Sequence, residues 1–125
     1  MTNKCILIID DEEDIREVAQ LCLEAVGAWQ VCTAQSGSEG LIKAQSQQPL
    51  AILLDIMMPD MDGLSTLEEL RANPLTKNIP VIFLTAKDNL LDGDRLAQMG
   101  VKGIISKPFD PMSLAEQVAQ FLENP

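Results

Sequence analysis

Hydrophobic residues occur along the chain in two alternating patterns. Short continuous runs such as CILII (5–9) and AILL (51–54) are typical of strands that are buried on both faces. Between them lie longer segments in which apolar residues recur every three or four positions, as in Ile15, Val18, Ala19 and Cys22. That spacing places apolar side chains on one face of a helix. The chain is therefore expected to alternate between strands and helices.

The continuous runs predict five strands, at Lys4–Asp10, Trp29–Ala34, Leu50–Asp55, Ile79–Thr85 and Lys102–Ser106. The helical pattern predicts five helices, at 15–26, from Ser36 onward, at 64–72, at 88–99 and from about 110 to 122. Five successive strand–helix units predict an α/β fold, a doubly wound, flavodoxin-like parallel sheet with helices on both faces. With the second strand at an edge, the strand order is 2-1-3-4-5.

Local signals mark some of the helix ends. Ser36 and Glu39 fit a capping box at the start of the second helix. Asp110 followed by Pro111 fits the start of the last helix, and Gly27 fits the end of the first.

The length and the net charge of the chain exclude several classes of function. The 125 residues suit a single domain spanning 1–125. The formal net charge is −10, from 9 basic and 19 acidic residues, which argues against binding to nucleic acid or to an anionic membrane. No apolar run is long enough to span a membrane, and the N-terminus lacks the pattern of a signal peptide. A cytoplasmic location is expected.

The chain has three cysteines and no histidine. A Cys/His zinc site and histidine-dependent nucleophilic catalysis are therefore excluded. Cys5, Cys22 and Cys32 all lie within apolar patterns, so core packing is their expected role.

Chemically active side chains stand at the carboxyl ends of the predicted strands. Asp10 and Asp11 end the first strand, Asp55 the third, Thr85 the fourth and Lys107 the fifth. In parallel sheets these ends meet at one edge, where ligands bind. Three carboxylates, a hydroxyl and an ammonium are therefore expected in one crevice.

Carboxylates gathered in this way repel one another. At ~5 Å and an effective dielectric of about 20, each pair costs roughly 3 kcal/mol. A hard divalent cation such as Mg²⁺, which takes oxygen ligands, would offset that repulsion. In ILIIDDEED (6–14), Asp10 and Asp11 are therefore candidate metal ligands, whereas Glu12–Asp14 are interpreted as acidic residues of a first helical turn.

The same carboxylates, hydroxyl and ammonium at the strand ends suit phosphoryl transfer. A carboxylate can form an aspartyl phosphate, while an ammonium and a metal neutralise the oxygens of the transferring group. Asp55 is the predicted nucleophile, Lys107 the ammonium and Thr85 a hydroxyl donor.

Four segments resemble the receiver domain of two-component response regulators: IIDDEED (8–14), LLDIMMPDMDG (53–63), IFLTAK (82–87) and GVKGIISKPF (100–109). The resemblance covers essentially the whole chain. It implies a stand-alone, Mg²⁺-dependent phosphorylation switch, which takes a phosphoryl group from a sensor histidine kinase, a histidine phosphotransfer protein or a small phosphodonor. Such a protein catalyses only its own phosphorylation and dephosphorylation.

The resemblance also implies residue roles on the metal side of the site. Asp55 corresponds to the phosphoacceptor, and Asp11 to the carboxylate that binds the metal directly. Asp10 would act mainly through a water, and the backbone carbonyl of Met57 would be a further ligand.

On the phosphoryl side, Thr85 resembles the switch hydroxyl and Lys107 the phosphoryl-contacting lysine. The backbone amide of Ala86 would also contact the phosphoryl group. The bond between Lys107 and Pro108 is usually cis in the family.

The chain departs from the family pattern at Ile104, where an aromatic residue is common and takes part in the signalling motion. This motion is expected to be altered, smaller or carried by Phe109. The two positions that tune phosphoryl lifetime hold Met57 and Lys87. Because an apolar Met57 does not position a hydrolytic water, self-dephosphorylation is expected to be slow.

Three other interpretations fit the sequence less well. An EF-hand reading of 58–69 places Met58, a poor calcium ligand, at its first position. An aspartate-dependent phosphohydrolase would show Asp-x-Asp, but Glu12 stands two residues after Asp10. A pseudo-receiver, an interaction module that takes no phosphate, would carry a damaged site, whereas all the key side chains are present.

If the 125 residues are the full protein, no output domain follows the last helix. Signalling would then be by docking to a target protein or by relay to a histidine phosphotransfer domain.

Overall fold

The computed structural model describes residues 5–27, 29–58, 61–86 and 100–123. Its strands are β1 (Cys5–Ile9), β2 (Gln30–Ala34), β3 (Ala51–Asp55), β4 (Val81–Ala86) and β5 (Gly103–Lys107). Its helices are α1 (Glu13–Ala25), α2 (Gly37–Gln47), α3 (Gly63–Ala72) and α5 (Leu114–Glu123). The expected helix at 88–99 lies outside the described residues.

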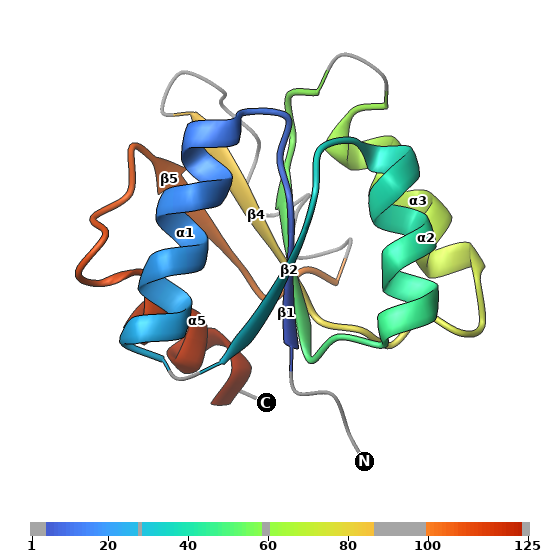
Figure 1. Cartoon of the computed structure of the whole chain (residues 1–125). Coiled ribbons are helices and arrows are strands. Elements are labelled where there is room, and N and C mark those ends of the chain that lie inside the picture. The colour runs from blue at the N-terminus through green and yellow to red at the C-terminus, as the bar shows by residue number, and fades with distance from the viewer. Residues whose placement is uncertain (1–4, 28, 59–60, 87–99, 124–125) are drawn as a thin grey trace.

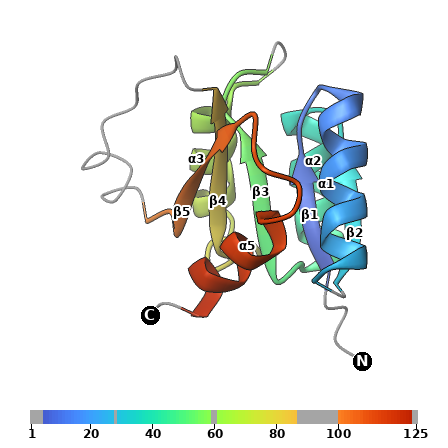
Figure 2. The same ribbon diagram turned by 90° about the vertical axis from the view of Figure 1, so that its left-hand side faces the viewer.

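The strands form one parallel sheet in the order β2-β1-β3-β4-β5, which confirms the predicted doubly wound fold. Helices α1 and α5 cover one face of the sheet and α2 and α3 cover the other (Figure 1). Turning the molecule by 90° shows the strands side by side, with α5 lying across one face (Figure 2).

The continuous apolar runs are buried on both faces because each face is covered by helices. In β1, Ile6 and Ile8 pack toward α1 and α5, while Leu7 and Ile9 pack toward α2 and α3. All four side chains are fully buried. This two-sided core fixes the register of β1, because a shift of one residue would exchange the two sets.

The cysteines have the core role that was predicted for them. Cys5 is buried, and Cys22 and Cys32 pack against the two core clusters. The Sγ atoms of Cys5 and Cys32 lie 3.4 Å apart as free thiols. Burial, reinforced by the contact with Cys5, raises the pKa of Cys32 to about 12, so this thiol is neutral at physiological pH.

The start of α2 was predicted correctly. Ser36 is its N-cap and accepts a hydrogen bond from the Glu39 backbone N–H at 3.1 Å. The Glu39 carboxylate forms an ion pair with Lys43 at 3.2 Å.

The predicted start of the last helix at Asp110–Pro111 is wrong, because α5 begins at Leu114. Asp110 begins a turn that leads directly into the helix, and its carboxylate accepts a hydrogen bond from the Met112 backbone N–H at 2.9 Å. Its carbonyl also accepts bonds from the N–H groups of Ser113 and Leu114.

Among the residues described, none of the helices is both long enough and apolar enough to cross a bilayer.

Candidate functional site

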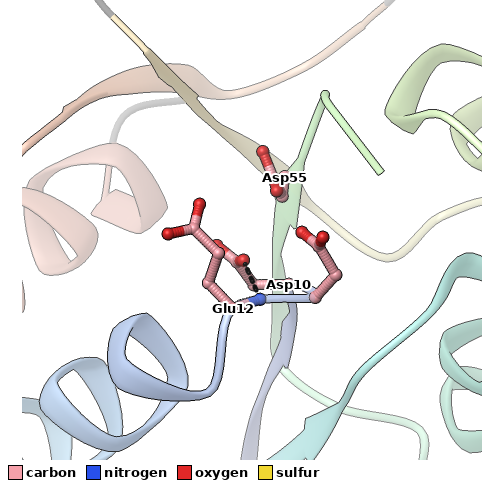
Figure 3. Close-up of side chains that lie close together, drawn as sticks. Asp10, Glu12 and Asp55 are labelled. Carbon is pink, nitrogen blue, oxygen red and sulfur yellow. Dashed lines mark hydrogen bonds between the residues drawn. The ribbon is translucent and has the colours of Figure 1, made fainter. Parts of the chain in front are cut away.

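The carboxyl ends of β1, β3 and β5 bring four acidic side chains and one ammonium together. Each of Asp10, Asp11, Glu12 and Asp55 offers a carboxylate oxygen, and these oxygens all lie within 4.8 Å of one another. Figure 3 shows Asp10 and Glu12 at the end of β1, beside Asp55 at the end of β3. Convergence of Asp10, Asp11 and Asp55 was predicted from the strand ends.

Burial divides the carboxylates into an inner and an outer pair. Asp10 and Asp55, the inner pair, are 0% and 3% exposed. Asp11 and Glu12, the outer pair, are exposed to solvent. The outer pair is therefore the part of the carboxylate cluster that is open to solvent.

Lys107 joins three of these carboxylates. Its Nζ lies 2.7 Å from Asp10 Oδ2, 3.3 Å from Asp55 Oδ1 and 3.6 Å from Glu12 Oε1. Burial alone would lower the pKa of Lys107, but its contacts with the carboxylates, Asp10 foremost, outweigh burial and raise this pKa above its usual value. The side chain is therefore a permanent ammonium within the site.

The surroundings of Asp55 disfavour the negatively charged form of its side chain. Burial and the nearby Asp10 carboxylate raise the pKa of Asp55 from 3.8 to about 6. Lys107 and a hydrogen bond from the Met57 backbone N–H, at 3.2 Å, oppose this rise without cancelling it. The ammonium alone therefore does not offset the burial of Asp55 and its repulsion from Asp10.

Backbone contacts fix Asp10 in place. Its N–H donates to the Ala34 carbonyl at 3.0 Å, and Oδ1 accepts the Glu12 backbone N–H at 2.9 Å. The Arg16 guanidinium donates to its carbonyl at 2.7 Å.

Close packing fixes the loop after β3. The Gly63 N–H donates to the Ile56 carbonyl at 2.8 Å. A Cβ at Gly63 would lie 2.6 Å from the Asp55 carbonyl oxygen, so only glycine allows this approach. The start of α3 is thereby held against the backbone that carries Asp55.

The donor set fits a hard divalent cation. Four carboxylates lie close together, and Mg²⁺ takes carboxylate oxygens and water in preference to nitrogen or sulfur. Burial, and after it the repulsion from Asp10, raises the pKa of Asp55, and a bound cation would favour its charged form.

The sheet places the remaining predicted residues at the same edge. Thr85 is buried at the end of β4, where it pairs with Ser106 of β5, and Ala86 pairs with Lys107. Met57 is exposed on the loop that follows β3. The roles of Thr85, Ala86 and the Met57 carbonyl remain predictions.

Sequence reasoning missed Glu12, which it assigned to the first turn of a helix. Glu12 is instead the N-cap of α1, with extended backbone (φ −90°, ψ 115°) and no capping bond from its side chain. Its carboxylate is therefore free of the helix and contacts Lys107. Glu13 and Asp14 do lie in the first turn, as predicted.

Further predictions concern residues around the site. The peptide bond between Lys107 and Pro108 is cis, as the resemblance implied. Ile104 is 37% exposed on β5 and, with Phe109, Gln117 and Phe121, lines a hollow between β5 and α5. Lys87 lies outside the described residues.

The EF-hand alternative gains no support from the described part of 58–69. Asp62 is the N-cap of α3 and accepts a hydrogen bond from the Ser65 backbone N–H at 2.8 Å, which is the turn role expected for it. Asp60 lies outside the described residues.

Comparison with known proteins adds independent information. The family model of the response regulator receiver domain matches residues 6–119. The chain is 38% identical over 122 residues to the alkaline phosphatase synthesis transcriptional regulatory protein PhoP of Bacillus subtilis, covering 98% of this chain and 50% of that protein.

It is also 38% identical to the response regulator Rre1 of Synechocystis over 119 residues, covering 94% of this chain and 51% of that protein. The chain thus spans about half the length of these curated relatives. Among solved structures, the chemotaxis response regulator CheY4 of Vibrio cholerae superposes with a TM-score of 0.84 at 28% identity, covering 96% of this chain and 99% of that one.

Proposed function

Since this chain belongs to the response regulator receiver family of two-component systems, we propose that Asp55 accepts a phosphoryl group from a sensor histidine kinase or a histidine phosphotransfer protein. The phosphorylated form then signals by docking to a target protein or by passing the group along a phosphorelay. The observation that carries the proposal is the ammonium of Lys107, which contacts both Asp10 and the buried Asp55.

The transfer itself needs little covalent chemistry from the protein. A carboxylate oxygen of Asp55 forms a bond to phosphorus while the phosphorus–nitrogen bond of the donor phosphohistidine breaks, and the imidazole keeps the electron pair. Lys107 stabilises the negative charge on the phosphoryl oxygens. Thr85 and the backbone amide of Ala86 donate hydrogen bonds to the same oxygens.

Mg²⁺ would be held by Asp11 and Asp55, by Asp10 through a water and by the Met57 carbonyl. When bound, it supplies positive charge that screens the carboxylates from the incoming phosphoryl group. Asp10 has a second task in the protein itself, because its short contact keeps Lys107 beside Asp55.

We propose that the protein is a switch that does not turn over any external substrate. It would act in the cytoplasm, as a receiver domain over residues 1–125. Its acidic character argues against direct contact with nucleic acid or anionic membranes. Some relatives are named transcriptional regulators, so the target of a longer protein containing this domain would be reached through its other parts. Hydrolysis of the acyl phosphate is expected to be slow because exposed, apolar Met57 positions no water.

Intact-mass measurement after incubation with acetyl phosphate tests the proposal. One added phosphoryl group is expected with Mg²⁺, none without it, and none in Asp55→Asn. Asp14→Asn, which removes an exposed carboxylate from α1, is the matched control and should still be modified.

Other outcomes would identify the alternatives. No added mass with acetyl phosphate or with a panel of sensor kinases would indicate a pseudo-receiver. Repeated turnover of an aryl phosphate would indicate a phosphohydrolase.

A further inference from the structure

Glu12 is the one member of the acidic cluster that has no role in the phosphoryl chemistry described above. Its side chain is 61% exposed, yet its carboxylate lies 3.6 Å from the Nζ of Lys107. It comes from the N-cap of α1, so the helix start directs it toward the site (Figure 3). Its position, at the solvent-exposed side of the carboxylate cluster (the mouth of the site), suggests that it acts on groups that enter the site.

The three contacts of Lys107 differ in length and in burial. The contact with Asp10, at 2.7 Å, is the shortest and is buried, whereas the contact with Glu12 is the longest and the most exposed. Exposed ion pairs are weak because solvent screens them and because ordering the side chains opposes them. When a phosphoryl group arrives, Lys107 can therefore release Glu12 at little cost and keep Asp10.

The charge of Glu12 also acts on whatever enters. Its carboxylate lies within 4.8 Å of the Asp55 carboxylate, and its side chain is exposed whereas Asp55 is buried. Small phosphodonors are anions, and like charges at such distances repel measurably even in water. A donor with more negative charge is repelled more.

We propose that Glu12 is a specificity-determining residue, an electrostatic gate that disfavours highly charged small phosphodonors at Asp55. The inference rests on the proposed function, because it assumes that Asp55 is the phosphoacceptor. The gate would limit phosphorylation by free acyl phosphates. A protein donor would be less affected, since contacts remote from Glu12 also contribute to its binding.

The test compares two small donors of different charge at saturating Mg²⁺, established separately for each variant. Acetyl phosphate carries more negative charge than phosphoramidate at neutral pH. In Glu12→Gln, the rate of modification by acetyl phosphate is expected to rise about three- to tenfold relative to the rate with phosphoramidate, the size expected for one nearby exposed charge. This donor-dependent gain should shrink as ionic strength increases, because salt screens the repulsion.

Two further variants separate charge from structure. Glu12→Asp keeps the negative charge at the mouth with a shorter side chain and should behave as wild type toward both donors. Glu13→Gln removes the same charge one residue away, from an exposed side chain outside the carboxylate cluster, and should show little donor dependence.

Equal changes with both donors in Glu12→Gln, or an equal donor-dependent gain in Glu13→Gln, would overturn the gate and leave Asp55 as the acceptor. Failure of every variant and of wild type to accept a phosphoryl group would instead overturn the acceptor assignment, and the gate with it.

Discussion

At the residue scale, the site is built from charges that the fold forces together. Asp10 and Asp55 are buried carboxylates at the ends of neighbouring strands, and Lys107 is the ammonium that lies against both. Within this group the Asp10–Lys107 pair must stay intact, since removing either partner would leave a buried charge uncompensated. The Asp10–Lys107 contact is accordingly the shortest in the cluster.

Asp55→Asn is predicted to change stability in a pH-dependent way when divalent cations are removed by a chelator. The folded protein raises the pKa of Asp55 to about 6, so it binds a proton more tightly than the unfolded chain does. Between pH 4 and 6 the stability contributed by this proton is lost as pH rises. Above pH 6 the neutral variant should therefore be more stable than wild type, by up to about 3 kcal/mol.

Denaturant unfolding at several pH values measures this difference. The advantage of Asp55→Asn should disappear near pH 4, where Asp55 is protonated in the folded protein. Asp14→Asn, at an exposed position of α1, is the control and should show no comparable gain. An advantage that persisted unchanged at pH 4 would contradict the assigned cause.

Most of the charged residues that the structure brings together were predicted from the sequence, and Glu12 is the exception. Strand ends identified Asp10, Asp11, Asp55 and Lys107, because parallel strands deliver their last residues to one edge. Glu12 was missed because its direction depends on the backbone angles of the N-cap. An acidic residue at a helix start has the same sequence signature whether it faces solvent or the site.

At the element scale, the loop between β3 and α3 links the position of a helix to the position of Asp55. Gly63 allows the first residue of α3 to contact the backbone of Asp55 and Ile56. The Asp62 side chain caps the same helix. The position of Asp55 is therefore coupled to the start of α3.

Gly63→Ala is predicted to lower the free energy of unfolding by about 2–3 kcal/mol. Its new Cβ would lie 2.6 Å from the Asp55 carbonyl oxygen and 2.6 Å from the Ile56 Cα, both backbone atoms that cannot rotate away. Urea unfolding measures the effect. Gly40→Ala is the matched control, since its Cβ would meet the Ile9 side chain, and the cost there should be smaller. Equal losses in both variants would show that backbone proximity at Gly63 has no special effect.

Element bounds followed the hydrophobic pattern wherever that pattern was unambiguous. Each strand was predicted to within two residues of its observed ends, because continuous apolar runs have few alternatives in a sheet covered on both faces. The start of α5 was misplaced because Asp110 and Pro111 have the signature of a helix start, whereas they form a turn that leads into the helix at Leu114.

At the scale of the whole molecule, a strongly acidic chain concentrates negative charge at one end of its sheet. The net charge is −10, and four carboxylates share the site. A bound divalent cation would reduce this repulsion in the folded state alone, because the unfolded chain separates the carboxylates. Cation binding should therefore be visible as increased stability.

Mg²⁺ is predicted to raise the melting temperature. At ten times its Kd, a ligand that binds only the folded protein adds about 1.4 kcal/mol, which corresponds to a shift of several degrees in a domain of this size. Differential scanning calorimetry with and without Mg²⁺ measures the shift. Asp11→Asn should lose most of it, whereas Glu13→Gln should retain it. A shift that survives in Asp11→Asn would place the cation elsewhere.

The central claim is that Asp55 is the residue that carries the phosphoryl group. Borohydride reduction after incubation with acetyl phosphate and Mg²⁺ converts an aspartyl phosphate to homoserine, and peptide mass spectrometry then locates the converted residue. Conversion at position 55 alone, absent without Mg²⁺, is the predicted result. Conversion at Asp10 or Asp11, or at no position in a protein that remains folded, would contradict the account.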